Sequence, residues 1–419
     1  MQRSPVNGMD FLWMLLVLAG EFGILFELLH LAWTTHYYLS NTNIPHAICR
    51  PGKLKLSYFV LIWLFSLDYI LWKIGICNNE YTIVKLLLDV FPPSKDPSLF
   101  ISHQDIEGIP VRIYQPKTSQ TQQRGIVFMH GGAGTLGSLD SYERLCRYIA
   151  KESNSVVLSI GYSLVPDQPY PVQFEQCLDV TVYFMKHAED YGVDPCRIII
   201  CGDSFGGILA ATICQMMVQR KDIPRLRAQM LIYPFLQVVK HSLPSYMQNA
   251  RVPILTKKQG LKFALQYLQK NISLQEVVLQ GAHVPKEKRM KYKKWLSPDN
   301  IPDEFKFREV KALPDPKHPF GEIKDLIDQL CGPLLSPLLV ENSILQQLPE
   351  TFILTVQYDI LRDDAILYKK RLEDNGVLVS WCHLEDGFHG SVALINNWVA
   401  KFPCAVKGAE HVVNYIRGL

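Results

Sequence analysis

Residues 197–207 constrain the fold of this chain most strongly, because they join a buried-strand pattern to a glycine-bounded serine. The consecutive apolar residues 198–201 are typical of a strand buried on both faces of a parallel sheet. A Gly-x-Ser-x-Gly motif centred on Ser204 follows, and residues 208–219 have a helical pattern. This order predicts a nucleophile elbow, a sharp turn that exposes the serine hydroxyl above a helix N-terminus. An idle serine in a glycine-rich turn is the alternative, so the assignment depends on partners for Ser204.

Strand and helix patterns alternate from Ile109 onward, which predicts an α/β fold with a mostly parallel sheet and helices on both faces. The expected strands are 111–114, 125–130, 156–160, 197–201, 228–233, 351–356 and 378–383. The expected helices include 141–152, 172–191, 208–219, 364–375 and 405–417. The alternation stops at about residues 235–348, and an interval of that length favours an inserted cap over a loop. Its basic run, 286–294, is interpreted as a solvated helix face, with contact to lipid head groups as the alternative.

A glycine-rich segment follows the expected strand 125–130 and predicts close contact between backbone and substrate. It reads Gly131-Gly132-Ala133-Gly134, and small residues let the backbone aim N–H groups at a ligand. In an α/β-hydrolase arrangement, this loop and the residue after the nucleophile, here Phe205, form the oxyanion hole. A plain glycine-rich turn is the alternative interpretation.

An acidic residue is expected after a later strand, at the carboxyl edge of the sheet. Asp359 follows the strand 351–356 closely and is the predicted acid. Asp363 is the second choice, since Asp363 and Asp364 have the positions of first-turn helix residues that favour a helix N-terminus.

The predicted base is His389, which lies in a glycine-flanked loop after the last expected strand. His383 ends that strand and His411 belongs to the terminal helix, so neither has the expected loop position. The chain order Ser204, Asp359, His389 is that of α/β-hydrolases and differs from the orders of the serine proteases. Three residues in this order on the expected loops favour a catalytic role for Ser204.

The N-terminal third contains two apolar stretches. Residues 1–40 are predicted to be a membrane anchor, because residues 11–33 are long enough to span a bilayer despite Glu21 and Glu27. No small-residue cleavage site follows, which favours an uncleaved signal-anchor. Within residues 41–105, the stretch 56–72 carries Asp68 and is open to three interpretations: a second span, an interfacial helix or part of a lid. A single span is preferred.

Flanking charges predict the orientation of the hydrolase domain, residues 106–419. With one span, Arg3 stays cytoplasmic and the large domain is lumenal; with two spans, Arg50 and its neighbouring lysines give the same result. The sequon at Asn271, which agrees with a lumenal domain, is the predicted glycosylation site.

The composition argues against nucleic-acid binding and against a metal site, and it leaves the disulfide pattern open. The net charge is +3 and the basic residues are scattered, which argues against a nucleic-acid partner. No His/Cys cluster has metal-ligand spacing, so no metal is expected. Acyl transfer through a serine nucleophile requires no cofactor, so none is expected either. The ten cysteines show no C-x-x-C pair or regular framework and leave the disulfide pattern open.

The motif combination resembles the hormone-sensitive-lipase branch of the α/β-hydrolases. The motifs that carry this resemblance are His130-Gly131-Gly132 and the segments 202–207, 359–364 and 386–390. The apolar N-terminus and the segments 161–166, 231–234, 243–246 and 295–298 are similar to the arylacetamide deacetylase-like family, and within it to the arylacetamide deacetylase-like 4 group. The resemblance covers nearly the whole chain. It implies an α/β-hydrolase fold, an endoplasmic-reticulum signal-anchor with a lumenal catalytic domain, and hydrolysis of lipophilic esters or acetamides.

Two motifs depart from the family pattern: the glycine-rich loop and the elbow. Ala133 and Gly134 stand where the family usually has a third glycine and an aromatic residue, so one wall of the acyl site is expected to be missing. Phe205 stands where the family usually has alanine, which keeps the N–H group and adds bulk. These substitutions are expected to affect the range of substrates and the catalytic rate, and not the type of reaction.

The sequence therefore predicts a membrane-anchored serine hydrolase that acts on lipophilic esters or amides through an acyl-enzyme. The assigned residues are Ser204 as nucleophile, His389 as base, Asp359 as its orienting acid, and Gly131, Gly132, Ala133 and Phe205 as oxyanion donors. Two alternatives stay open: a catalytically weak binder of a lipophilic ligand, and an acyltransferase.

Overall fold

A single eight-stranded sheet forms the centre of the computed structural model, with the strand order β1-β2-β4-β3-β5-β6-β7-β8. The structure describes residues 8–90, 93, 96–117, 122–279, 281, 284–306, 327–395 and 401–419, with side chains from residue 20 onward. The strands are β1 (Leu99–Ile106), β2 (Ile109–Pro116), β3 (Gln123–Met129), β4 (Val156–Ile160), β5 (Val193–Asp203), β6 (Ala228–Ile232), β7 (Glu350–Tyr358) and β8 (Val379–Phe388). β2 pairs antiparallel with β1 and β4, and all other neighbours pair in parallel.

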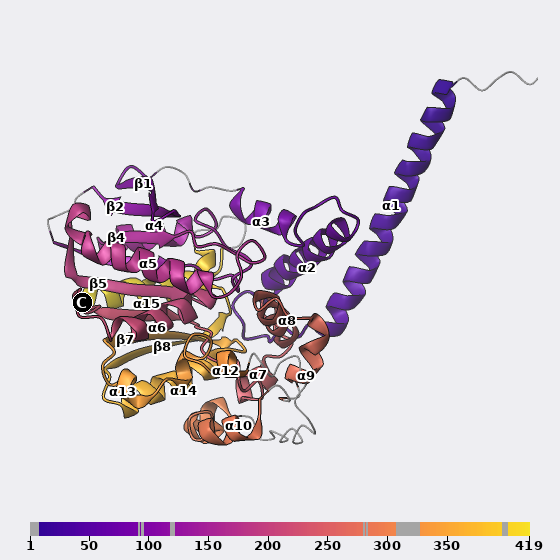
Figure 1. Ribbon diagram of the computed structural model, residues 1–419. Helices are drawn as coiled ribbons and strands as arrows, with labels where there is room; N and C mark the ends of the chain where they lie inside the picture. The colour runs from indigo at the N-terminus through magenta and orange to yellow at the C-terminus, as the bar shows by residue number, and fades with distance from the viewer. Residues whose placement is uncertain are drawn as a thin grey trace, which may run out of the picture.

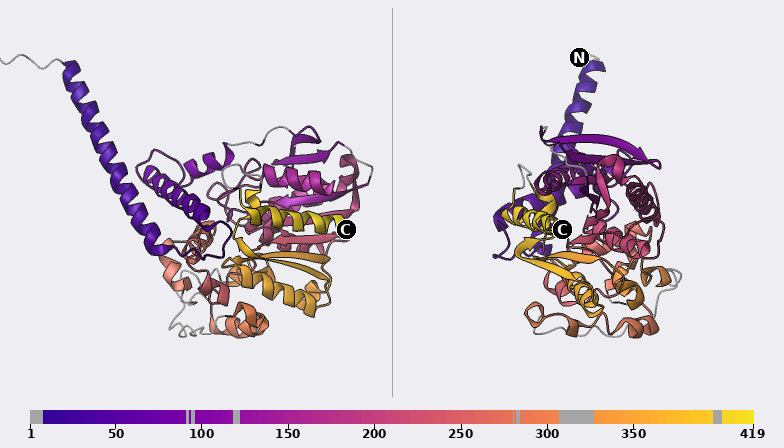
Figure 2. Two further views of the ribbon diagram at one scale, coloured as in Figure 1. Left: turned by 180° about the vertical axis from the view of Figure 1, so that it is seen from behind. Right: turned by 90° about the vertical axis from the view of Figure 1, so that its left-hand side faces the viewer.

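Helices cover both faces of the sheet, as Figures 1 and 2 show. One face packs against α4 (Glu143–Ser153) and α15 (Pro403–Gly418). The other packs against α5 (Val172–Lys186), α6 (Phe205–Met217) and α14 (Arg362–Asp374). Because the central strands are buried on both sides, they read as continuous apolar runs in the sequence.

The predicted fold class is confirmed, and each expected strand of the sheet is present. β1 was not predicted, because only its first and last residues are buried and it lacks an apolar pattern. The helix expected at 172–191 is divided into α5 and the short 3₁₀ helix η1 (Ala188–Tyr191). The other predicted helices of the sheet domain correspond to α4, α6, α14 and α15.

The segment between β6 and β7 contains short helices and, in its described part, no strand. They are α7 (Pro244–Gln248), α8 (Lys257–Tyr267), η2 (Ile272–Leu274), α9 (Gln275–Leu279), α10 (Lys286–Tyr292), η3 (Pro298–Asn300), η4 (Asp303–Phe305), α12 (Ile327–Leu330), η5 (Pro337–Leu339) and α13 (Asn342–Leu345). This arrangement is what a cap inserted at about 235–348 would have; residues 307–326 lie outside the described part. A last short helix, η6 (Val392–Leu394), follows β8.

The basic run of the cap forms α10 and its C-terminal extension. Lys286, Lys291 and Lys294 are exposed. Lys288 and Lys291 form ion pairs with Asp328 (2.8 Å) and Glu341 (3.1 Å) of the same cap segment. These contacts agree with the interpretation as a solvated helix face.

The described residues before the sheet form the helices α1 (Gly8–Asn41), α2 (Pro51–Lys73) and α3 (Thr82–Asp89). α1 extends away from the body of the protein, and most of its apolar side chains between Phe22 and Leu39 are exposed (Figure 1). Within the residues whose side chains are described, α2 is the one helix long and apolar enough to cross a membrane, and the side chains of α1 are described from residue 20 onward. Arg3, one of the charges used to predict orientation, lies outside the described residues.

α2 and Tyr81, the residue before α3, also contact the cap helix α8. The Tyr58 hydroxyl of α2 donates a hydrogen bond to the Gln259 side chain (3.0 Å), and the Tyr81 hydroxyl donates one to Gln266 (2.6 Å). Asp68, the charge inside the apolar stretch 56–72, is buried and accepts the N–H groups that begin α3, at 2.8 and 2.9 Å. The stretch 56–72 therefore contacts the cap through α8.

Candidate active site

Ser204 lies at a sharp turn between β5 and α6. Its φ of 52° and ψ of −115° place it in a sparsely populated backbone region that costs about 1–3 kcal/mol. The flanking glycines make the turn possible: a Cβ on Gly202 would lie 2.1 Å from the Gly206 carbonyl oxygen, and one on Gly206 would lie 1.9 Å from that of Met129. Both flanking positions therefore require glycine, because at each of them another part of the backbone lies too close for a side chain.

Ser204, His389 and Asp359 form a continuous hydrogen-bonded chain. Ser204 Oγ lies 2.9 Å from His389 Nε2, and His389 Nδ1 lies 2.8 Å from Asp359 Oδ2. Asp359 is 1% exposed and His389 is 6% exposed, so the chain is shielded from solvent. The three residues come from the ends of β5, β7 and β8, at the carboxyl edge of the sheet. The structure thus brings together the residues that the sequence singled out.

Asp359 is held in place by its own loop and by the cap. The Leu361 N–H donates to Asp359 Oδ1 at 2.9 Å, and the Asn249 amide donates to the Asp359 carbonyl at 2.9 Å. Asp363, the second choice for the acid, instead accepts from Arg362 Nε (2.9 Å) and from the Ser245 N–H (2.6 Å). Asp363 is thereby committed to a buried ion pair, which leaves Asp359 as the acid that faces the histidine.

The other histidines of the C-terminal part lie away from this chain. His383 contacts Thr355 and Gln357 side chains, at 2.8 and 3.1 Å. His411 is exposed on α15. His389 packs beside the Tyr233 ring at a centroid distance of 5.0 Å, which restricts the rotation of its imidazole.

The glycine-rich loop after β3 lies against the elbow through Asp203. The Gly131 N–H donates to Asp203 Oδ1 (2.8 Å), and the Tyr142 hydroxyl donates to Asp203 Oδ2 (3.0 Å). Burial raises the pKa of Asp203 to about 6. The Gly131 N–H is therefore already engaged, which differs from the expectation that it donates to an oxyanion.

Gly132 and Ala133 have N–H groups that make no hydrogen bond within the described part of the chain. Phe205 is the first residue of α6, so its N–H has no partner inside the helix. Ala133 adopts φ 58°, in the left-handed region where the family usually has glycine. The loop conformation is thus kept despite the substitution.

His130 has a structural position beneath this loop. Its Nδ1 donates to the Gly131 carbonyl at 2.8 Å, and its ring stacks on Tyr162 at 4.2 Å. Burial lowers the pKa of His130 to about 4, so the ring is neutral at physiological pH. His130 therefore fixes the backbone that carries the candidate oxyanion donors.

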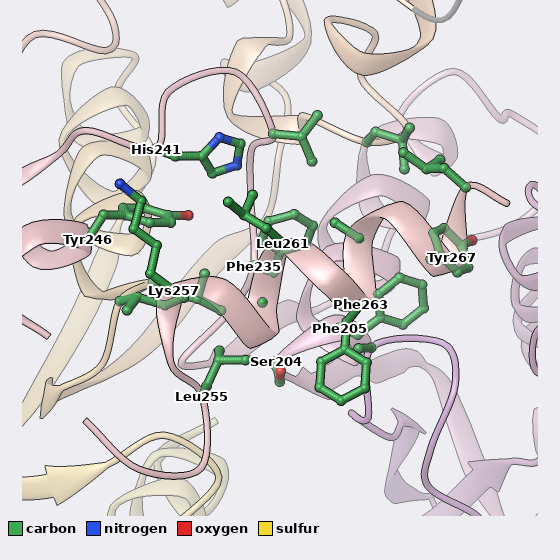
Figure 3. A pocket seen from close by; sticks show the side chains of 18 residues that line it. Ser204, Phe205, Phe235, His241, Tyr246, Leu255, Lys257, Leu261, Phe263 and Tyr267 are labelled. Atoms are coloured by element: carbon green, nitrogen blue, oxygen red, sulfur yellow. The ribbon is translucent and has the colours of Figure 1, made fainter. Parts of the chain in front are cut away.

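An apolar pocket opens above Ser204, as Figure 3 shows. Its walls come from the elbow, from the start of the cap and from α8. The residues that line it include Ala133, Phe205, Phe235, Leu255, Leu261, Phe263, Tyr267 and Leu361. A largely hydrophobic lining around one reactive group is typical of a site for a lipophilic small molecule.

Phe205 and Tyr267 occupy the side of the pocket where an acyl-site wall was expected to be missing. A Cβ added to Gly134 would lie 2.6 Å from the Tyr267 ring and 3.2 Å from the Phe205 ring. The two rings contact each other edge to face, with centroids 4.8 Å apart. The departures from the family pattern at positions 134 and 205 are thus complementary in volume.

Sequence reasoning missed Asp203, Asn249 and the pocket face of α8. Asp203 lies inside the elbow motif, so its position next to the serine was an available signal. Asn249 and α8 belong to the cap, where the packing partners are far apart in sequence and no motif marks them.

Comparisons with known proteins agree with this geometry. The family described as "alpha/beta hydrolase fold" matches residues 126–285 and 325–393. Human arylacetamide deacetylase-like 4 is 42% identical over 97% of this chain and 99% of that protein. Human arylacetamide deacetylase-like 3 is 41% identical over 92% and 95%, and arylacetamide deacetylase of Bos taurus is 38% identical over 73% and 77%.

Solved structures share the fold. The structure of DphMB1 superposes with a TM-score of 0.61 at 27% identity, over 80% of this chain and 91% of that one. A thermostable esterase from Pseudomonas putida superposes with a TM-score of 0.62 at 19% identity, over 85% and 96%. With the sequence identity to the curated relatives extending over nearly the whole chain, the protein belongs to the arylacetamide deacetylase family of α/β-hydrolases.

Proposed function

We propose that this protein is a serine hydrolase that cleaves carboxylic esters, or acetamides, of lipophilic molecules. The observation that carries the proposal is the chain Ser204–His389–Asp359, with links of 2.9 and 2.8 Å, at the base of an apolar pocket. Nucleophile, base and orienting acid within hydrogen-bond reach are the requirement for acyl transfer to a serine.

In the proposed mechanism, Ser204 Oγ attacks the substrate carbonyl while His389 Nε2 accepts its proton. Asp359 holds the His389 tautomer and stabilises the imidazolium. The tetrahedral intermediate collapses, His389 returns the proton to the leaving alcohol or amine, and an acyl-enzyme remains. Water, deprotonated by His389, then attacks the acyl group and regenerates Ser204.

The proposed oxyanion donors are the N–H groups of Gly132, Ala133 and Phe205. Each such donor typically lowers the activation free energy of acyl transfer by about 2.7–4 kcal/mol. Gly131 instead fixes the loop through its bond to Asp203. No cofactor takes part in these steps, because the chain supplies nucleophile, base and donors.

The substrate class is inferred from the pocket and from the relatives. The lining is apolar and aromatic, which favours a lipophilic acyl or alcohol part. The relatives bear the names of arylacetamide deacetylases, and an amide and an ester are cleaved by the same acyl-transfer steps. We therefore include both bonds in the proposal.

A fluorophosphonate probe tests the proposal on full-length protein in membranes. We expect labelling at Ser204, identified by peptide mass, and hydrolysis of aryl esters by the same preparation. Absence of labelling and of turnover would contradict the proposal and favour a binder of a lipophilic ligand. Transfer of the acyl group to an added alcohol in preference to water would favour an acyltransferase.

Phe205→Ala is expected to change acyl preference while keeping the backbone donor. The Phe205 ring packs on Tyr267 in the pocket, so its loss should open space for longer acyl chains. We expect the ratio of kcat/KM for octanoyl over acetyl esters to rise on the order of 10-fold, from an apolar contact worth about 1–3 kcal/mol. An unchanged profile from acetyl to octanoyl would show that the ring does not contact the acyl group.

We further propose an endoplasmic-reticulum membrane protein with one span, α1, and a lumenal hydrolase domain. Most apolar side chains of α1 between Phe22 and Leu39 are exposed, and the helix extends away from the body of the protein in Figure 1. Its length of 34 residues corresponds to about 51 Å of helix, enough to cross a bilayer with some tilt. Asn271, the acceptor of the sequon, is exposed on the cap.

Asn271 is therefore expected to carry a glycan. Full-length protein made with microsomes should lose mass on endoglycosidase treatment, and Asn271→Gln should abolish that loss. Protease added outside sealed microsomes should spare the hydrolase domain. Digestion of that domain in intact vesicles, with Asn271 unmodified, would place it in the cytosol and contradict the proposed topology.

A further inference from the structure

The pocket contains one buried ammonium group that the proposed reaction does not use. Lys257 is the first residue of α8, is 9% exposed and lines the pocket. Figure 3 shows its side chain ending beside Tyr246 and His241, away from Ser204. The pocket thus has a reactive end at Ser204 and a polar end at Lys257.

Lys257 has no acidic partner in the described part of the chain. The contact of its Nζ with a side chain is to the Met247 sulfur, at 3.8 Å. Burial lowers the pKa of Lys257, and no charged neighbour among the described residues offsets that effect. An ammonium group buried without a counter-ion is costly, by several kcal/mol in proteins.

The neighbouring groups do not neutralise this end of the pocket. The Tyr246 hydroxyl is committed to Asp364, to which it donates at 2.9 Å. The His241 ring packs edge to face on Tyr246 at 5.5 Å and is also buried. An incoming anion would therefore find a desolvated cation with free N–H donors.

We propose that Lys257 binds an anionic oxygen group, a carboxylate or a phosphate, at the end of the substrate remote from the bond that is cleaved. This inference rests on the proposed function and narrows its substrate class: lipophilic esters or amides that also carry one distal negative charge. Neutral lipophilic esters of the same length would leave the ammonium unpaired and bind less well.

Matched ester series test this inference with full-length protein in neutral detergent. Within a series the scissile bond is constant, and the distal end of the acyl or alcohol part is a carboxylate, a phosphate or a methyl group. We expect kcat/KM for an anionic ester to exceed that for its methyl counterpart on the order of 10- to 100-fold, the range of a charged hydrogen bond. Comparison of the carboxylate and phosphate arms identifies which anion is preferred.

Lys257→Met should reduce the ratio of kcat/KM for the anionic ester over its methyl counterpart to about one. Lys257→Arg should keep part of the wild-type preference. Lys258→Met is the matched control, because Lys258 is adjacent in sequence but exposed. The control should keep the wild-type ratio. A wild-type ratio near one, or a ratio that survives in Lys257→Met, would overturn the inference.

A binding measurement separates this inference from the proposed reaction. Dodecanoate, but not dodecanol, should raise the melting temperature of Ser204→Ala protein, and the additional Lys257→Met change should abolish that shift. If no ester is hydrolysed by wild-type protein, the proposed function fails, and the binding result still decides the role of Lys257. Equal shifts of the melting temperature with dodecanoate and dodecanol would overturn the proposed role of Lys257.

Discussion

Ser204→Ala is expected to lower ester turnover on the order of 10³- to 10⁶-fold while leaving the fold intact. The loss arises because the hydroxyl is the proposed nucleophile, whereas the turn is held by the backbone. The Ser204 N–H donates to the Ile232 carbonyl at 2.9 Å, and this bond does not involve the side chain. Turnover per molecule, together with thermal melting of the purified protein, checks both parts of the expectation.

His389→Ala and Asp359→Ala should also reduce turnover steeply, and the double change of Ser204 and His389 should be little worse than either alone. The reason is that the residues act as one unit. Asp363→Ala serves as the comparison, since Asp363 pairs with Arg362 in the core and its loss should appear mainly as reduced stability. Retained activity in Asp359→Ala with loss in Asp363→Ala would show that the acid is misassigned.

Gly132→Ala is expected to lower kcat on the order of 10²- to 10³-fold. Gly132 has φ 107°, and a Cβ there would lie 2.2 Å from the Leu136 carbonyl oxygen. The loop would have to shift, which would move the N–H groups of Gly132 and Ala133 away from a developing oxyanion. Loss of one such donor costs about 2.7–4 kcal/mol of barrier. Steady-state kinetics with one aryl ester gives the measurement.

Ala133→Gly is the matched control for that change. Ala133 adopts φ 58°, which glycine accommodates without strain, so this variant should keep its activity and gain up to about 1 kcal/mol of stability. Comparable losses in the two variants would mean that the loop tolerates no change at all. Full activity in Gly132→Ala would remove this loop from the oxyanion site.

Much of the candidate site was predictable, because several of its residues lie in short sequence motifs that are typical of α/β-hydrolases. The β5 apolar run and its glycines predict the elbow, and their cause is now visible in two backbone contacts at Gly202 and Gly206. Asp359 and His389 were predictable from their places after strands, since parallel strands end at one edge of the sheet.

The rest of the site depends on tertiary contacts that leave no local pattern. Phe205 and Gly134 appeared as separate departures from the family, and only their shared contact with Tyr267 shows that they are complementary. Lys257 and Lys258 are neighbours in sequence with opposite exposure, and the sequence alone does not distinguish them. β1 was missed because an edge strand needs few apolar residues.

The cap helix α8 joins the N-terminal helices to the pocket. Gln259 and Gln266 bond to the N-terminal helices, while Leu261, Ala264 and Tyr267 line the pocket on the other side. A shortened version of the protein that begins just before β1 would therefore lose the contacts that support this wall of the pocket, together with α1. Kinetic constants from such a fragment would therefore describe a different pocket.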